Sequence, residues 1–150
     1  MQVSIDKVRK LREKTNISVI ECKKALESSN GDIEKALKIL KKKGADILAK
    51  KKGKETKEGI IGIYLHQNEK VAAMVKVSCE SDFVARNAEF KNFVHELTMQ
   101  IAAMAPSNVN ELLEQLYIKD VKKTIKDLLE ETVAKLGENV KIEEFKRFEI

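Results

Sequence analysis

The sequence lacks the features on which several protein classes depend. It has no tryptophan, one proline and only 5% aromatic residues, and no apolar run approaches the roughly 18–20 residues that a membrane-spanning helix needs. Its six glycines are scattered and form no phosphate-binding loop, which argues against direct nucleotide binding. Cys22 and Cys79 have no metal-ligand spacing and are expected to be buried thiols. Because no secretory signal pattern is present, we expect a cytoplasmic protein without a membrane anchor.

Candidate catalytic groups are equally scarce. The sequence has two histidines, His66 and His95, and neither has an acid–base or nucleophilic grouping around it. We therefore expect a protein that is not an enzyme and that holds no cofactor or metal of its own.

What the sequence does have is an uneven distribution of charge. Residues 1–58 carry 17 Lys+Arg against 9 Asp+Glu, and residues 59–150 carry 12 against 15, so the net charge of +5 divides into +8 and −3. The basic part suggests either RNA or an acidic protein surface as a partner. Because residues 1–58 contain no aromatic side chain on which bases could stack, nucleic acid is the less favoured partner. A small basic RNA-binding module stays the alternative function.

Helix-capping signals divide the first third into three short helices. Ser18 followed by Glu21 is typical of a capping box, and Asn30-Gly31 is typical of a helix end. Asp32 is expected to open the third helix, which we predict to end at Gly44.

The remainder mixes strands with helices. Apolar residues alternate over residues 60–65 and 71–77, which predicts an antiparallel hairpin. The pattern further predicts a long helix from Asn87 to Pro106, a short helix around 111–116, a helix over 121–136 and a third strand over 140–150 with a bulge or an edge position. The expected fold class is α+β: a three-helix head (1–44), a basic linker (45–58) and a small body (59–150) with a three-stranded antiparallel sheet packed against helices.

The most informative segment is Ser81-Asp82-Phe83-Val84-Ala85-Arg86, where the second strand gives way to the long helix. It predicts a carboxylate and a large ring side by side at an exposed corner, with a guanidinium close behind. Such a pair could act as a wedge against a partner. The alternative is that Asp82 caps a helix and Phe83 fills the core.

Two stretches extend the analysis further. Residues 11–26 (LREKTNISVIECKKAL) and 79–86 (CESDFVAR) resemble the two signatures of translation elongation factor Ts, and the resemblance continues through 30–36 (NGDIEKA) and 135–139 (KLGEN). It implies a guanine-nucleotide exchange factor that binds elongation factor Tu·GDP, disturbs the Mg²⁺ and phosphate site and promotes GDP release during translation elongation.

The resemblance also implies roles for particular residues. The head would resemble a ubiquitin-associated fold and dock on the GTPase through Arg12, Val19 and Ile20, although Val19 and Ile20 could instead belong to the head's own core. The exchange wedge would comprise four residues: Ser81, Asp82, Phe83 and Val84.

The chain departs from the family pattern in its length. Relatives usually carry a longer segment, including a helical hairpin, between the positions of Met104 and Tyr117, and long members have a second copy of the core subdomain. Short members can pair two chains instead. We therefore expect a possible homodimer through the body, using the exposed edge strand at 140–150.

Overall fold

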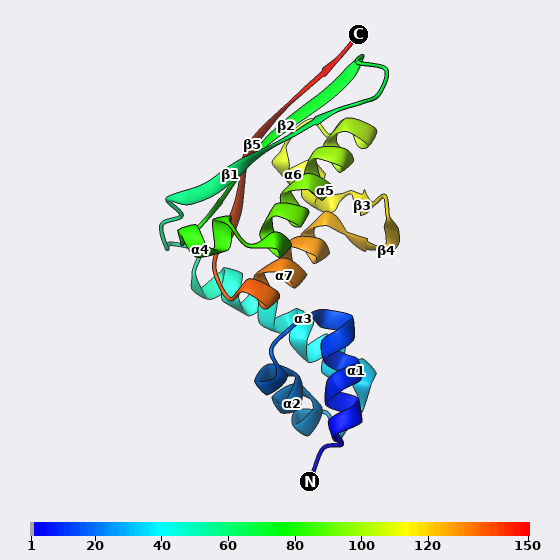
Figure 1. Cartoon of the computed structure of the whole chain (residues 1–150), viewed down its shortest axis with the longest axis vertical. Helices are drawn as coiled ribbons and strands as arrows, with labels where there is room; N and C mark the ends of the chain where they lie inside the picture. Colours follow the sequence, from blue (N-terminus) through cyan, green and yellow to red (C-terminus); the bar gives the residue numbers. More distant parts are fainter. Residues whose placement is uncertain (1) are drawn as a thin grey trace.

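The computed structural model describes residues 2–150, which form a helical head at one end and a mixed body at the other (Figure 1). The helices are α1 (Ile5–Thr15), α2 (Val19–Ser28), α3 (Ile33–Lys50), α4 (Asp82–Ala85), α5 (Ala88–Met104), α6 (Val109–Glu114) and α7 (Ile125–Leu136). The strands are β1 (Glu58–Leu65), β2 (Val71–Cys79), β3 (Leu116–Tyr117), β4 (Asp120–Thr124) and β5 (Val140–Glu149). This confirms the predicted α+β class. None of the helices in this part of the chain is both long and apolar enough to cross a membrane.

The head is built from α1, α2 and α3 around a hydrophobic core of its own. Two of its predicted caps are confirmed, because Ser18 accepts a hydrogen bond from the backbone N–H of Glu21 and Asp32 accepts one from that of Lys35. The buried core consists of Leu11, Ile17, Cys22, Ala25, Leu26, Ala36 and Leu40.

Helix α3 is longer than predicted and joins the head to the body. The predicted end at Gly44 is wrong, because the helix continues to Lys50. Gly44 is buried where α3 crosses α7, and a Cβ atom there would lie 2.0 Å from the backbone oxygen of Glu130. The glycine therefore permits a close helix crossing instead of ending a helix. Of the predicted linker 45–58, residues 45–50 are helical and residue 58 begins β1.

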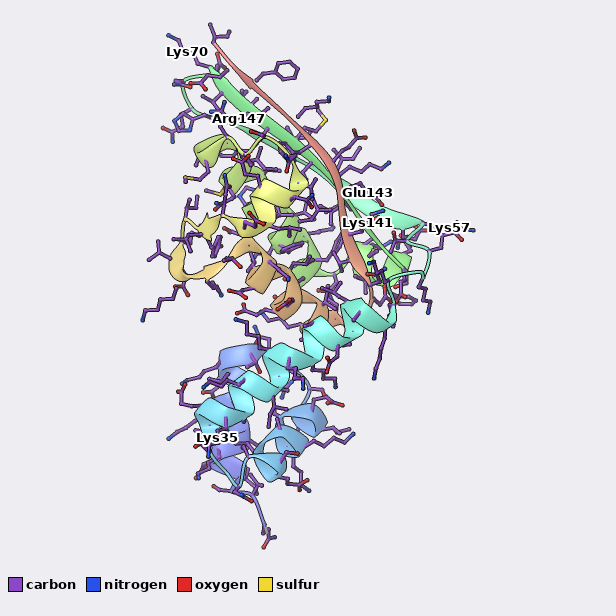
Figure 2. All side chains as sticks on the ribbon, turned by 180° about the vertical axis from the view of Figure 1, so that it is seen from behind. Lys35, Lys57, Lys70, Lys141, Glu143 and Arg147 are labelled. Atoms are coloured by element: carbon purple, nitrogen blue, oxygen red, sulfur yellow. The ribbon has the colours of Figure 1, made fainter. Side chains whose placement is uncertain are left out.

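The body contains the predicted three-stranded antiparallel sheet, in the order β1-β2-β5. Strand β5 lies at an edge and its pairing with β2 shifts between Lys76 and Val77, which confirms the predicted bulge and edge position. Helix α5 packs on the inner face, and Arg147 of β5 donates to the backbone oxygen of Ala102 from Nε at 3.1 Å and from Nη2 at 3.0 Å. Figure 2 shows Lys141, Glu143 and Arg147 spaced along this edge strand.

The outer face of the sheet carries no helix (Figure 1), and it mixes large apolar side chains with the exposed charges of Lys76, Glu144 and Lys146. Its inward-facing β1 positions are Ile60, Gly62 and Tyr64, whereas the alternate positions are exposed. The exposed apolar side chains of this outer face are Ile61, Ile63 and Leu65 of β1, Met74 of β2 and Phe148 of β5.

A small second sheet, β3 with β4, was not predicted. Val121, which we expected in the last helix, lies in β4, and α7 begins only at Ile125. The hairpin is held to α5 by Glu96, whose carboxylate accepts hydrogen bonds from Tyr117 Oη at 2.7 Å and from Lys119 Nζ at 2.7 Å. Burial raises the pKa of Glu96, but these two hydrogen bonds outweigh it and hold the pKa below its ordinary value.

Candidate functional site

The corner at residues 81–86 begins where β2 ends and includes the single turn of α4. Ser81, not Asp82, is its N-cap: Ser81 Oγ accepts a hydrogen bond from the backbone N–H of Val84 at 3.3 Å. The carbonyl of Ser81 accepts a second one from Ala85 N–H at 3.1 Å. The alternative in which Asp82 supplies the cap is therefore wrong.

Phe83 points out of the molecule, with 92% of its surface exposed. The residues that follow point the other way, because Val84 and Ala85 are buried in the core of the body. The alternative in which Phe83 fills the core is wrong. Val84, which the resemblance placed in the exchange wedge, is buried and so anchors the turn from beneath. A large exposed ring on an anchored turn has no role in this chain's own packing, which is typical of a contact side chain.

Asp82 lies beside the ring and forms an exposed ion pair. Its carboxylate is 2.6 Å from the guanidinium of Arg86, one helical turn further on. Both side chains are largely exposed, so the pair contributes little to stability. The predicted carboxylate, ring and guanidinium are therefore brought together as expected, and the two charged groups are free to exchange partners.

A largely buried carboxylate supports the corner from the strand side. Glu80 lies 3.2 Å from Lys51 Nζ and 3.4 Å from Lys54 Nζ. Burial of Glu80 raises its pKa, but the hydrogen bond and charge of Lys51, with the nearby charge of Lys54, hold the pKa below its ordinary value. Two lysines of the predicted basic linker, Lys51 and Lys54, are thus joined to the base of the corner.

The thiol of Cys79, fully buried at the end of β2, offers a chemical reporter for the corner. Its Sγ donates a hydrogen bond to the Ser81 carbonyl at 3.3 Å, and burial, with the charge of Glu138, raises the pKa of the thiol from 9.0 to about 11. Thiolate, not thiol, reacts with disulfide reagents.

We predict that native Cys79 reacts with such a reagent at pH 8 at least about 100-fold more slowly than the unfolded chain, because the raised pKa lowers the thiolate fraction and burial excludes the reagent. Peptide mapping by mass spectrometry separates it from Cys22, and the reaction in guanidinium is the control. Rapid labelling of native Cys79 would contradict the burial of its thiol beneath the corner.

The head presents a second candidate surface. Val19 and Ile20 are both exposed at the start of α2, so the alternative that places them in the head's core is wrong. Arg12 is exposed in the last turn of α1. Sequence reasoning missed Ile5, which is exposed and lines a groove together with Val3, Val8 and Val19. Ile5 is the first residue of α1, and no motif in the sequence marked it as a surface residue.

The two surfaces are held on one framework. Lys41 of α3 forms an ion pair with Asp127 of α7 at 2.9 Å, close to the Gly44 crossing. Asn16, at the end of α1, donates from Nδ2 to Glu89 Oε1 of α5 at 3.4 Å. Helix α5 follows the corner directly, so contacts from both α3 and α1 position the head relative to Phe83.

The chain is similar to known proteins over its whole length. A family model described as Elongation factor TS matches residues 80–150. The chain is 40% identical over 193 aligned positions to Elongation factor Ts of Thermotoga neapolitana, covering 100% of this chain and 98% of that protein. It is 39% identical to that of Thermotoga maritima (100% and 97%) and 40% identical over 192 positions to that of Thermoanaerobacter pseudethanolicus (98% and 94%). The chain belongs to the elongation factor Ts family.

Membership of the elongation factor Ts family gives the chain a role in translation elongation, and so in protein biosynthesis. The alignment also shows by how much this chain is shorter than its relative. The alignment with the T. neapolitana protein spans 193 positions against 150 residues here, so 43 of its positions have no residue from this chain. Between α5 and β3 the structure has only the short helix α6, where we predicted the shortening.

Proposed function

We propose that this protein is a guanine-nucleotide exchange factor for elongation factor Tu in the cytoplasm. The observation that carries the proposal is the exposed Phe83 ring beside Asp82 on an anchored turn. In this mechanism the head docks through Arg12, Val19 and Ile20, and the ring inserts among side chains of the GTPase near its nucleotide site.

The exchange step is a matter of coupled binding and requires no covalent chemistry. A factor that binds the GTPase better when GDP and Mg²⁺ are absent weakens the binding of both by the same factor. Mg²⁺ needs near-ideal octahedral coordination by protein and phosphate oxygens. A small displacement of the loops that bind it therefore weakens the binding of GDP. GTP then displaces the factor by mass action, and the factor itself needs no nucleotide site, which is why we propose that it is not an enzyme.

The test is the release of a fluorescent GDP analogue from elongation factor Tu, chased with unlabelled GDP. We expect substoichiometric amounts of the protein to accelerate the release, because each molecule acts on many GTPases in turn. A release rate that does not change with the concentration of the protein would contradict the proposal.

We also propose that two copies of the chain associate through the body, since the uncovered outer face of the sheet offers more than the edge strand alone. Five large apolar side chains are exposed there across all three strands, next to the charges of Lys76, Glu144 and Lys146, and exposed apolar side chains gathered in this way favour an interaction surface. Two identical faces can meet about a two-fold axis and bury the patch of each.

The corresponding variant is Ile63→Lys, in the middle of this patch. We expect the wild-type mass from light scattering at micromolar concentration to be twice the 17.0 kDa of the chain, and the variant to be monomeric because it would bury an unpaired charge. Val121→Lys is the control, since Val121 on β4 is exposed to a similar degree, 68% against 66%. A monomeric wild-type protein would refute the dimer.

A further inference from the structure

Both oxygens of one carboxylate, that of Glu138, bind the residue that starts the corner. Glu138 Oε1 accepts a hydrogen bond from the backbone N–H of Ser81 at 3.0 Å, and Oε2 accepts one from Ser81 Oγ at 2.6 Å. The second distance is typical of a charge-assisted O–H···O⁻ bond, which is stronger than a neutral one. Glu138 lies in the turn between α7 and β5, 57 residues away in the sequence, so this contact is tertiary.

The Glu138 contact determines how Ser81 caps α4. The Ser81 hydroxyl has one proton and directs it to Glu138, which leaves its lone pairs facing the backbone N–H of Val84, from which it accepts. A helix of four residues cannot hold its own orientation, because one turn in isolation is unstable. The burial of Val84 and Ala85 determines which side of α4 faces outward, and the cap restricts the movement that is left to the Phe83 ring.

The turn that carries Glu138 is itself tied to the end of α3. Asn139 is buried and donates from Nδ2 to the backbone oxygens of Lys51 at 3.1 Å and Lys54 at 3.3 Å. In return Lys51 Nζ donates to the backbone oxygen of Gly137 at 3.1 Å and to Glu80 Oε2 at 3.2 Å. The turn, the end of α3 and the base of the corner thus form one hydrogen-bonded frame.

We propose that Glu138 is a positioning residue for nucleotide exchange, acting through Ser81 to fix the direction in which Phe83 leaves the surface. The inference rests on the proposed function and assigns the residue no contact with the GTPase. A ring already held in the binding direction loses little conformational entropy when it inserts, whereas a mobile ring must first be ordered.

A double-mutant cycle separates this role from a general effect on the fold. GDP release is measured with the wild type, Glu138→Ala, Phe83→Ala and the double variant. We expect Glu138→Ala alone to lower the acceleration about tenfold, the size of effect typical for losing a hydrogen-bonded charged group. In the Phe83→Ala background the same change should alter release less than twofold, because there is no ring left to position. An equal loss in both backgrounds, or none in either, would overturn the proposal.

Two further variants complete the cycle. Glu111→Ala is the matched control, because Glu111 Oε2 likewise accepts a backbone hydrogen bond, from Ser107 at 3.2 Å, at the start of a different helix. It should leave release unchanged. Glu138→Gln replaces the alanine variant if that one does not fold, since it removes the negative charge and replaces one of the two acceptor oxygens with an NH2 group that only donates.

Amide hydrogen exchange, measured on the protein alone, tests the inference without elongation factor Tu. Glu138→Ala should speed exchange at Ser81 and Val84 about tenfold while the core amides keep their protection. If the wild type fails to accelerate GDP release, the proposed function fails. The hydrogen-exchange measurement still shows whether Glu138 fixes the Ser81 cap. Unchanged protection at both amides would overturn the inference.

Discussion

Replacing Phe83 with alanine is expected to reduce the acceleration of GDP release by about thirtyfold or more. A central aromatic contact is typically worth at least ~2 kcal/mol of binding, which corresponds to that factor. Because the ring is almost fully exposed, its removal leaves no cavity, and the free energy of unfolding should change by no more than about 0.5 kcal/mol. Loss of exchange with unchanged stability is the combination that distinguishes a contact residue from a core residue.

The measurement compares release rates of a fluorescent GDP analogue over a range of factor concentrations, with urea unfolding of the same samples. Val121→Ala is the control, because this exposed apolar residue lies on β4, away from the corner. Equal acceleration by the wild type and the Phe83→Ala variant would remove the ring from the mechanism. RNA binding that is sensitive to salt and survives the substitution would favour the basic RNA-binding alternative instead.

Replacing Gly44 with alanine is expected to destabilise the protein, although the same change usually stabilises a helix by about 0.5–1 kcal/mol. The added Cβ would lie 2.0 Å from the backbone oxygen of Glu130 and 3.3 Å from the Cβ of Ala134. Backbone cannot rotate away as a side chain can, so α3 and α7 must separate. Overpacking of this kind costs about 1–3 kcal/mol, which outweighs the gain in helix propensity.

The change at Gly44 should lower the midpoint of thermal unfolding by about 2–4 °C for each kcal/mol lost. It should also weaken nucleotide exchange, since the crossing fixes the head relative to the corner. Gly53→Ala serves as the control, because nothing lies within 4 Å of the Cβ that it would add. A midpoint equal to or above that of the wild type would show that the helices tolerate the extra methyl group.

Much of the fold could be predicted because its signals are local. Ser18, Asp32 and Asn87 each accept a hydrogen bond at a helix start that sequence reasoning predicted. The alternation over residues 60–65 and 71–77 likewise determined the hairpin, since a period of two is read directly from neighbouring side chains.

The errors arise where distant contacts override local patterns. Gly44 has the sequence signature of a helix end, but the close approach of Glu130 requires a glycine inside the helix. The β3–β4 hairpin has no alternating apolar pattern. Besides Tyr117, which is buried in the core, polar contacts hold it: Ile118 N–H donates to Gln100 Oε1 of α5 at 3.0 Å, beside the contacts of Glu96. No window of sequence contains both partners.

In the candidate site, too, local features could be predicted from the sequence and distant contacts could not. The residue types of the corner are visible in the sequence, but whether Phe83 points in or out is decided by Val84 and Ala85, which bury the opposite side of α4. The carboxylate of Glu138 could not be assigned to Ser81 from sequence, because the turn that carries it comes after α5, α6 and α7.

The most direct test of the exposed ring as the partner contact is photo-crosslinking from position 83. A benzophenone amino acid replaces Phe83, keeps an aromatic ring at that position and forms a bond only with what it touches. The account predicts an adduct with nucleotide-free elongation factor Tu that excess GDP and Mg²⁺ suppress, and none from the same group at position 121. An adduct from position 121 with none from position 83 would contradict it.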